Sequence, residues 1–188
     1  MIIKTFIVVI IFIMSCGFAF ADGPWKGKIL DVETKEPLEG VVVLAVWDRI
    51  YRTPFGTSSY FYEAKETASN KEGEFEIPSY TPINMLPIIS YMQGPEFTIF
   101  KPGYGSLRMS LGDYLNSNTK KPQEMELLGK KYRFESGIIE LPRLIYKEER
   151  LRNIPGGPTD VGDDKLPFFY KSINEERINL GIRGSVKK

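Results

Sequence analysis

The chain has 188 residues, of which 42% are hydrophobic and 26% are charged, as is typical of a globular protein rather than a disordered one. It contains no histidine, and its one cysteine is Cys16. These absences exclude histidine-ligated zinc and haem sites, Ser-His and Cys-His catalytic pairs, and an intrachain disulfide. The sequence therefore bears more on compartment and fold than on a specific activity.

Residues 1–21 have the organisation of a secretory signal peptide. Lys4 precedes an apolar run over residues 5–18, and small residues follow at the positions that a signal peptidase recognises. We expect cleavage between Ala21 and Asp22 and export to the periplasm or the extracellular space.

The charge balance after cleavage bears on possible partners. Loss of Lys4 leaves 24 basic and 24 acidic residues, so the mature chain has no formal net charge and no basic block. Such a chain lacks the electrostatic footprint of a nucleic-acid binder, and we expect no nucleic-acid partner. Two alternatives to cleavage place the protein on a membrane. One is lipidation at Cys16, because residues 13–16 resemble a bacterial lipobox, and the other is an uncleaved N-terminal anchor.

From Trp25 onward the pattern is typical of short β-strands separated by turns. Residues 25–32 alternate loosely between apolar and polar, and a polar turn ending at Pro37 follows. Residues 41–47 form an unbroken apolar run, too short for a typical helix, which predicts a strand buried on both faces. An irregular stretch is expected over residues 48–64.

The strongest local signal is a turn followed by an alternating segment. Asn70 suits the first position of a type I turn and Gly73 suits the last. Acidic and apolar residues then alternate over residues 74–77, as in a half-solvated strand. We interpret this segment as a β-hairpin, with Phe75 and the earlier Val43 in the core.

The rest of the chain is predicted to alternate loops with short elements. Loops are expected over residues 79–94 and 113–136, strands over 97–100 and 137–142, a short charged helix over 147–153, and an amphipathic helix over 166–180. The apolar stripe of the last helix, Phe169, Ile173 and Leu180, belongs to a helix too short to be stable alone. We expect it to dock in cis on its own sandwich, with docking on a partner as the alternative.

Three segments resemble, in order, the carboxypeptidase regulatory-like domain family. They are residues 27–31, 34–43 and 70–77, and residues 100–104 stand at the position of that family's return strand. The resemblance covers about residues 25–105 and extends to transthyretin-like and collagen-adhesin B-type modules, all small antiparallel β-sandwiches. It implies a non-catalytic module, because in metallocarboxypeptidases this domain lies beside the zinc enzyme and holds no catalytic residues. The chain departs from the family pattern at Asn70, often Asp there, and in the long aromatic segment 48–64.

We therefore expect a mainly β protein, an antiparallel β-sandwich of the transthyretin-like type with a short C-terminal helical extension. The predicted parts are the signal peptide over residues 1–21, the sandwich over 22–142 and the extension over 143–188. Circular dichroism of the mature chain should accordingly show mostly strand.

The aromatic segment is the candidate ligand surface. The side chains predicted to contact a ligand are Tyr51, Arg52, Phe55, Tyr60 and Tyr62, because exposed rings beside hydrogen-bonding groups suit sugar or protein surfaces. The alternative is that these rings close the open end of the sandwich.

Acidic residues cluster at 160–164. They offer oxygen ligands of the kind that calcium accepts, but without the spacing of an EF-hand loop. The alternative is that Asp163 or Asp164 caps the following helix. Phosphate-loop and dinucleotide-binding spacings are absent from the sequence, and we expect no catalytic residues, no cofactor and no metal site.

These observations predict a non-catalytic exported module of the cell envelope, serving protein interaction or structural support. Its partner would be an envelope protein or a glycan, with membrane contact only through a lipidated Cys16 or a retained signal peptide. The alternative function is carbohydrate binding through the aromatic segment.

Overall fold

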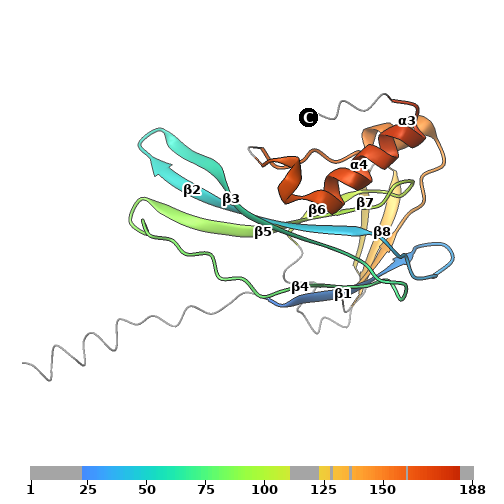
Figure 1. Ribbon diagram of the computed structural model, residues 1–188. Helices are drawn as coiled ribbons and strands as arrows, with labels where there is room; N and C mark the ends of the chain where they lie inside the picture. Colours follow the sequence, from blue (N-terminus) through green and yellow to red (C-terminus); the bar gives the residue numbers. More distant parts are fainter. Residues whose placement is uncertain (1–22, 111–122, 128, 136, 160, 183–188) are drawn as a thin grey trace, which may run out of the picture.

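The computed structural model describes residues 23–110, 123–127, 129–135, 137–159 and 161–182. Within these residues the protein is mainly β, with two sheets packed face to face and short helices near the C-terminus (Figure 1). The predicted β-sandwich with a C-terminal helical extension is confirmed.

The strands fall into two sheets, with the order β4-β1-β9-β8-β7 in one and β3-β2-β5-β6 in the other. In chain order they are β1 (Trp25–Asp31), β2 (Val42–Thr53), β3 (Gly56–Ala68), β4 (Glu74–Ile77), β5 (Ser90–Phe100), β6 (Leu107–Met109), β7 (Gln123–Leu127), β8 (Lys130–Glu135) and β9 (Ile138–Leu141). The helices are α3 (Lys147–Arg152), the 3-10 turn η1 (Asp163–Lys165) and α4 (Pro167–Asn179). Figure 1 shows α4 above the β2 sheet and β1 with β4 below it.

The pairing is antiparallel except between β1 and β9, which run in parallel with Ile29 opposite Ile139. The expectation of an antiparallel sandwich needs this correction. A parallel pair requires a long crossover connection, and here the whole second sheet and the β7–β8 hairpin lie between the two strands in sequence.

The turn after β3 forms as predicted, but the prediction that it joins two paired strands of a β-hairpin is wrong. Asn70 Oδ1 accepts hydrogen bonds from the N–H groups of Glu72 and Glu74 at 3.1 and 2.8 Å, and Gly73 has a φ of +77°. The strands on either side belong to different sheets, because β3 pairs with β2 whereas β4 pairs with β1. The crossing between sheets carries Phe75 into the space that both sheets enclose.

Two segments predicted to be loops contain strands. β7 and β8 form a hairpin within residues 113–136, and β5 begins at Ser90, inside the loop expected over residues 79–94. In β8, Tyr132 and Phe134 are buried while the residues between and beside them are charged. This alternation is that of a half-buried strand, but the polar average of the segment conceals it.

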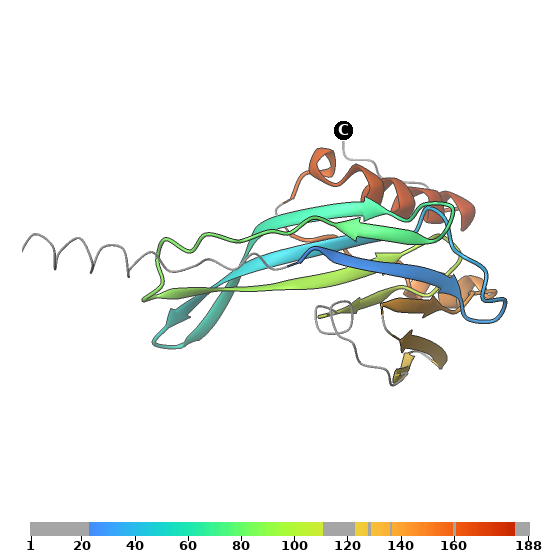
Figure 2. The ribbon, with the colours of Figure 1, turned by 90° about the horizontal axis from the view of Figure 1, so that it is seen from below.

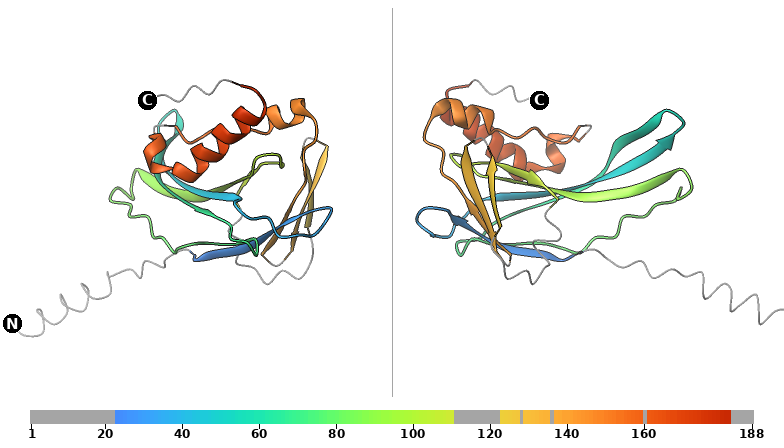
Figure 3. Two further views of the ribbon diagram at one scale, coloured as in Figure 1. Left: turned by 45° about the vertical axis from the view of Figure 1, so that its right-hand side comes forward. Right: turned by 180° about the vertical axis from the view of Figure 1, so that it is seen from behind.

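β2 is buried on both faces over its first half, as predicted. Val43 and Ala45 belong to the core between the sheets, whereas Val42 and Leu44 pack with Phe169 on the outer face. The helix α4 covers that outer face (Figure 3), so it docks in cis on its own sandwich.

The N-terminus of α4 is capped from the sheet below it. The carboxylate of Glu66, on β3, accepts hydrogen bonds from the N–H groups of Phe168 and Phe169 at 2.8 and 2.9 Å. The N-cap residue is Leu166 and the acceptor is Glu66, so the predicted cap by Asp164 is wrong, and the side chain of Asp163 lies outside the described ones. Glu66 also places negative charge at the positive end of the helix dipole.

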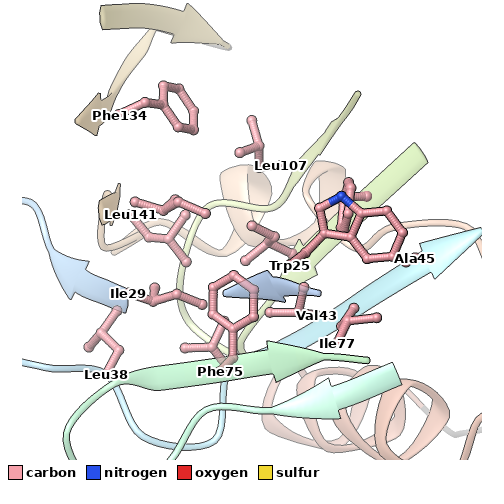
Figure 4. Close-up of a cluster of buried hydrophobic side chains, with 14 of the residues drawn as sticks. Trp25, Ile29, Leu38, Val43, Ala45, Phe75, Ile77, Leu107, Phe134 and Leu141 are labelled. Atoms are coloured by element: carbon pink, nitrogen blue, oxygen red, sulfur yellow. The ribbon is translucent and has the colours of Figure 1, made fainter. Parts of the chain in front are cut away.

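The core between the sheets contains large aromatic side chains. The rings of Trp25 and Trp47 lie 5.6 Å apart, and Phe97 stands edge-on to Trp25 at 5.7 Å. Figure 4 shows Trp25, Val43 and Phe75 among the aliphatic side chains that fill this space. Val43 is 0% and Phe75 5% exposed, so the predicted core positions of both residues are confirmed.

Candidate functional site

The aromatic segment 48–64 is the distal half of a long β-hairpin and not an irregular stretch. β2 and β3 pair continuously to the turn, where Thr53 lies opposite Gly56 and the Thr53 hydroxyl donates to the Gly56 carbonyl at 2.9 Å. Together with β5, this hairpin continues past the end of β1 and β4 (Figure 2). Residues 49–62 are called the tip below.

A bulge at the base of the tip divides the hairpin. The β3 partners of β2 jump from Glu63 opposite Trp47 to Phe61 opposite Asp48, which makes Tyr62 the extra residue on β3. The side chains of β2 keep alternating between the two faces of the sheet past the bulge. Every second residue of β2 after Trp47 therefore lies on the same face as Trp47, which we call the inward face.

The predicted ligand-contact residues are not brought together on one face. Tyr51, opposite Ser58, shares the inward face with Tyr60, which lies opposite Arg49. Arg52 lies on the other face, and Phe55 occupies the turn at the end of the hairpin, with its side chain fully exposed.

Several rings at this end already have a neighbour. Arg49 lies 4.7 Å above the ring of Tyr62, Arg52 lies 5.2 Å above that of Tyr91, and Tyr51 packs edge-on against Tyr60 at 5.6 Å. A sugar that stacks on Tyr62 or Tyr91 would find one ring face covered by a guanidinium group.

The inward face of the tip bounds a shallow depression. Its volume is about 600 Å³, and its lining comprises Arg49, Tyr51, Thr53, Ser58, Tyr60, Phe61 and Tyr62. At its inner limit, Tyr80 packs on Trp47 at 4.9 Å under the ammonium group of Lys65. Burial, with Tyr62 and Glu63 nearby, raises the pKa of Tyr80, so its hydroxyl stays protonated at neutral pH.

Residues 78–89, called the strap below, connect β4 to β5 along the same end of the molecule (Figures 1 and 2). Asn84 holds it in place: its amide donates to the carbonyl of Ser90 at 2.8 Å and accepts from the Ser90 hydroxyl at 2.9 Å and the Leu86 N–H at 3.1 Å. The Tyr62 hydroxyl donates to the Ile83 carbonyl at 3.2 Å, which ties the strap to the tip.

The tip, the strap and the start of β5 carry large exposed apolar side chains at this end of the molecule. We name the open-end surface by these residues, which are Phe55, Tyr60, Ile83, Met85, Leu86, Ile88, Ile89 and Tyr91. Ile88 is 88% and Met85 83% exposed. Exposed apolar side chains gathered at one end of a soluble protein favour an interaction site there.

Charge is distributed unevenly around the open-end surface. Residues 78–95 contain no charged residue, and residues 49–62 contain two arginines and no acid, in a chain that is 26% charged. The nearest acid on β5, Glu96, pairs with Arg108 at 3.0 Å. The strap was predicted only as a loop, although its charge-free sequence is a signal of an apolar exposed segment.

Other predicted site residues are not brought to this end, or lie outside the described residues. Cys16, Ala21, Asp22 and Asp160 are outside them, so the predicted cleavage site and the alternatives of lipidation and of calcium binding at residues 160–164 are not tested. Within the described ranges, no three acidic or cysteine side chains gather as metal ligands would, and no helix is long and apolar enough to cross a membrane.

Comparisons of the chain with known protein families, with curated proteins and with solved structures each find no match. The resemblance to the carboxypeptidase regulatory-like family therefore rests on the quoted segments alone and remains a prediction.

Proposed function

We propose that this protein is a non-catalytic exported module that binds another component of the cell envelope through the open-end surface. The observation that carries the proposal is the gathering of eight exposed aliphatic and aromatic side chains at one end of the domain, with exposures from 39% for Tyr91 to full exposure for Phe55. Burial of apolar area yields about 25 cal/mol per Å², so large exposed side chains such as Phe55, Met85 and Ile88 favour association.

Export is proposed from the predicted signal peptide. The fold is compatible with it: the described domain builds its core from two packed sheets, and the sequence after residue 21 contains no cysteine. A domain of this size buries enough apolar area to be stable without disulfides.

The experiment uses the mature chain, residues 22–188, immobilised and exposed to envelope fractions. Replacing Met85 and Ile88 together by Ser should reduce retention of envelope material at least tenfold, because both side chains are exposed and their loss disturbs no core contact. The matched control is Ile178→Ser on α4, since Ile178 is 70% exposed but lies away from the open end. Equal retention by both variants would contradict the proposed surface.

Carbohydrate binding is the second candidate function, favoured by the depression lined with three tyrosines, Ser58 and Thr53. Its test is a glycan array with the mature chain. Specific binding that Tyr60→Ala abolishes and the Met85/Ile88 double variant leaves intact would favour this function over the first. The guanidinium of Arg49 over Tyr62 makes it the weaker candidate.

A further inference from the structure

The open-end surface has features that point to the kind of partner it takes. Its most exposed residues come from a turn and from a loop, Phe55 at the hairpin end and Ile88 with Met85 on the strap, and they project from the molecule. Figure 3 shows the hairpin and β5 reaching out in the same direction at this end. Projecting apolar side chains suit insertion into a soft apolar phase, whereas a rigid protein partner requires a matching hollow.

The backbone of the strap supplies many of its own hydrogen bonds. The N–H groups of Ile89 and Ser90 donate to the Leu86 carbonyl at 3.2 and 2.9 Å, and Asn84 accepts from the Leu86 N–H. Entry into a medium without water is costly for unpaired polar groups. These internal bonds lower that cost at Leu86 and Ile89, two of the residues that carry exposed aliphatic side chains.

Arg49 and Arg52 are the charged residues of the tip, and the strap has none. The acids Asp48 and Glu63 flank the tip at its base, where Asp48 accepts a hydrogen bond from the Ser59 hydroxyl at 3.1 Å, so the far part of the tip carries the arginine charge of Arg52. Each guanidinium lies over a tyrosine ring, and Arg52 is exposed. Tyrosine and arginine beside aliphatic residues are the side chains that favour the headgroup layer of a membrane, and an exposed cation such as Arg52 is attracted to anionic lipids.

The chain also enters the domain at this end. A Cβ on Gly23 would lie 3.2 Å from the Cα of Ser79, at the root of the strap, so the two segments are adjacent. The apolar run over residues 5–18 precedes Gly23. An N-terminus that keeps this run, or a lipid at Cys16, would hold the open-end surface toward the bilayer.

From these observations we infer that the open-end surface docks on a lipid bilayer that contains anionic headgroups. The inference rests on the proposed function, of which it names the partner. Membrane contact then no longer depends on lipidation or a retained signal peptide, because the folded domain itself supplies the contact.

The first experiment follows insertion by fluorescence. The native Trp25 and Trp47 are buried, so a new tryptophan at an exposed position reports its own surroundings. Mature Phe55→Trp should shift its emission to the blue on addition of vesicles with equal parts phosphatidylcholine and phosphatidylglycerol, and should shift little with phosphatidylcholine alone. The control Tyr146→Trp, exposed near α3, should not shift with either. An unshifted Phe55→Trp spectrum would overturn the inference.

The second experiment measures binding by vesicle co-sedimentation. Met85→Ser with Ile88→Ser should weaken binding at least tenfold, and Arg52→Gln about fivefold on the anionic vesicles. Ile178→Ser and Arg152→Gln, exposed on α4 and α3, are the matched controls and should bind as the wild type does.

The outcomes separate this inference from the proposed function. Absence of vesicle binding, with retention of envelope proteins that the Met85/Ile88 variant loses, would overturn the lipid inference and leave the proposed function standing. Self-association that the same variant abolishes would identify a second copy as the occupant and also overturn it. If the protein bound neither vesicles nor envelope proteins and did not self-associate, the lipid inference and the proposed function would both be contradicted.

Discussion

The two ends of this sandwich differ in what covers the same sheet. At the closed end, where α4 lies over it, Phe169 is 0% and Ile173 3% exposed. At the open end, β2 and β3 continue without the facing strands β1 and β4, and Phe55 is fully exposed (Figures 2 and 3). The apolar side chains at the open end are therefore exposed because the facing strands β1 and β4 do not extend over them.

The polar groups follow the same division. At the closed end, the buried carboxylate of Glu176 accepts two hydrogen bonds from Arg150, at 2.8 and 2.6 Å, and one from the Gly103 N–H at 3.1 Å. Arg52 at the open end lies over a ring and faces solvent. The Arg150–Glu176 contact therefore stabilises the packing of α3 against α4 at the closed end, whereas the Arg52 side chain at the open end is accessible to solvent.

The largest expected difference comes from truncating one phenylalanine at each end. Phe169→Ala should lower the free energy of unfolding by about 3–5 kcal/mol, because it removes a buried ring between α4 and β2. Phe55→Ala should change it by less than about 0.5 kcal/mol. Urea denaturation of the mature chain measures both. Equal losses would show that the open end is covered in solution.

A pair of arginines tests the polar side of the comparison. Arg150→Met should lower the free energy of unfolding by about 2–4 kcal/mol, since it leaves the carboxylate of Glu176 buried without its cation. The hydrogen bond to Glu176 also raises the pKa of Arg150, so this side chain is charged at every accessible pH. Arg52→Met should be nearly neutral. An unchanged free energy of unfolding in Arg150→Met would contradict this prediction, because it would mean that water solvates the carboxylate of Glu176.

Alkaline pH should lower the free energy of unfolding through a tyrosine that is buried in the core. Burial raises the pKa of Tyr132 to about 12, against about 10 in an unfolded chain. Since the folded state prefers the protonated phenol, the stabilisation is present below pH 10 and is lost as the pH rises through 12. The loss is about 1.4 kcal/mol by pH 11.

The check on this pH dependence is the replacement of Tyr132 by phenylalanine. Tyr132→Phe should remove about 1.4 kcal/mol of the fall in unfolding free energy between pH 9 and pH 11. An unchanged pH dependence in Tyr132→Phe would mean that Tyr132 does not contribute to it.

The smallest expected effect concerns the contact that joins the helix to β3. Glu66→Ala should lower the free energy of unfolding by about 1 kcal/mol, because two N–H groups at the start of α4 lose their acceptor. Glu72→Ala, exposed in the turn after β3, is the control and should change it little. Amide hydrogen exchange should locate the change in Glu66→Ala at the first turn of α4; an unaffected first turn would contradict the cap.

Local patterns allowed several elements to be predicted. The apolar run ahead of Trp47, the turn from Asn70 to Gly73 and the apolar stripe of α4 each express a preference that a short segment has by itself. The burial of Val43 and Phe75 followed from the same patterns. The partner of each strand did not, because β4 can satisfy its alternation beside either β3 or β1.

The sequence by itself determined the mainly β character, the turn chemistry and the docking stripe of α4, because these depend on neighbours within a few residues. Only the tertiary structure decided the parallel pairing of β1 with β9, the cap from Glu66 and the division of Tyr51 and Arg52 between two faces. It also decided that the strap is tied to the tip, through the hydrogen bond from the Tyr62 hydroxyl to the Ile83 carbonyl. Exposure is a property of what the rest of the chain leaves uncovered, and a segment's own residues do not encode it.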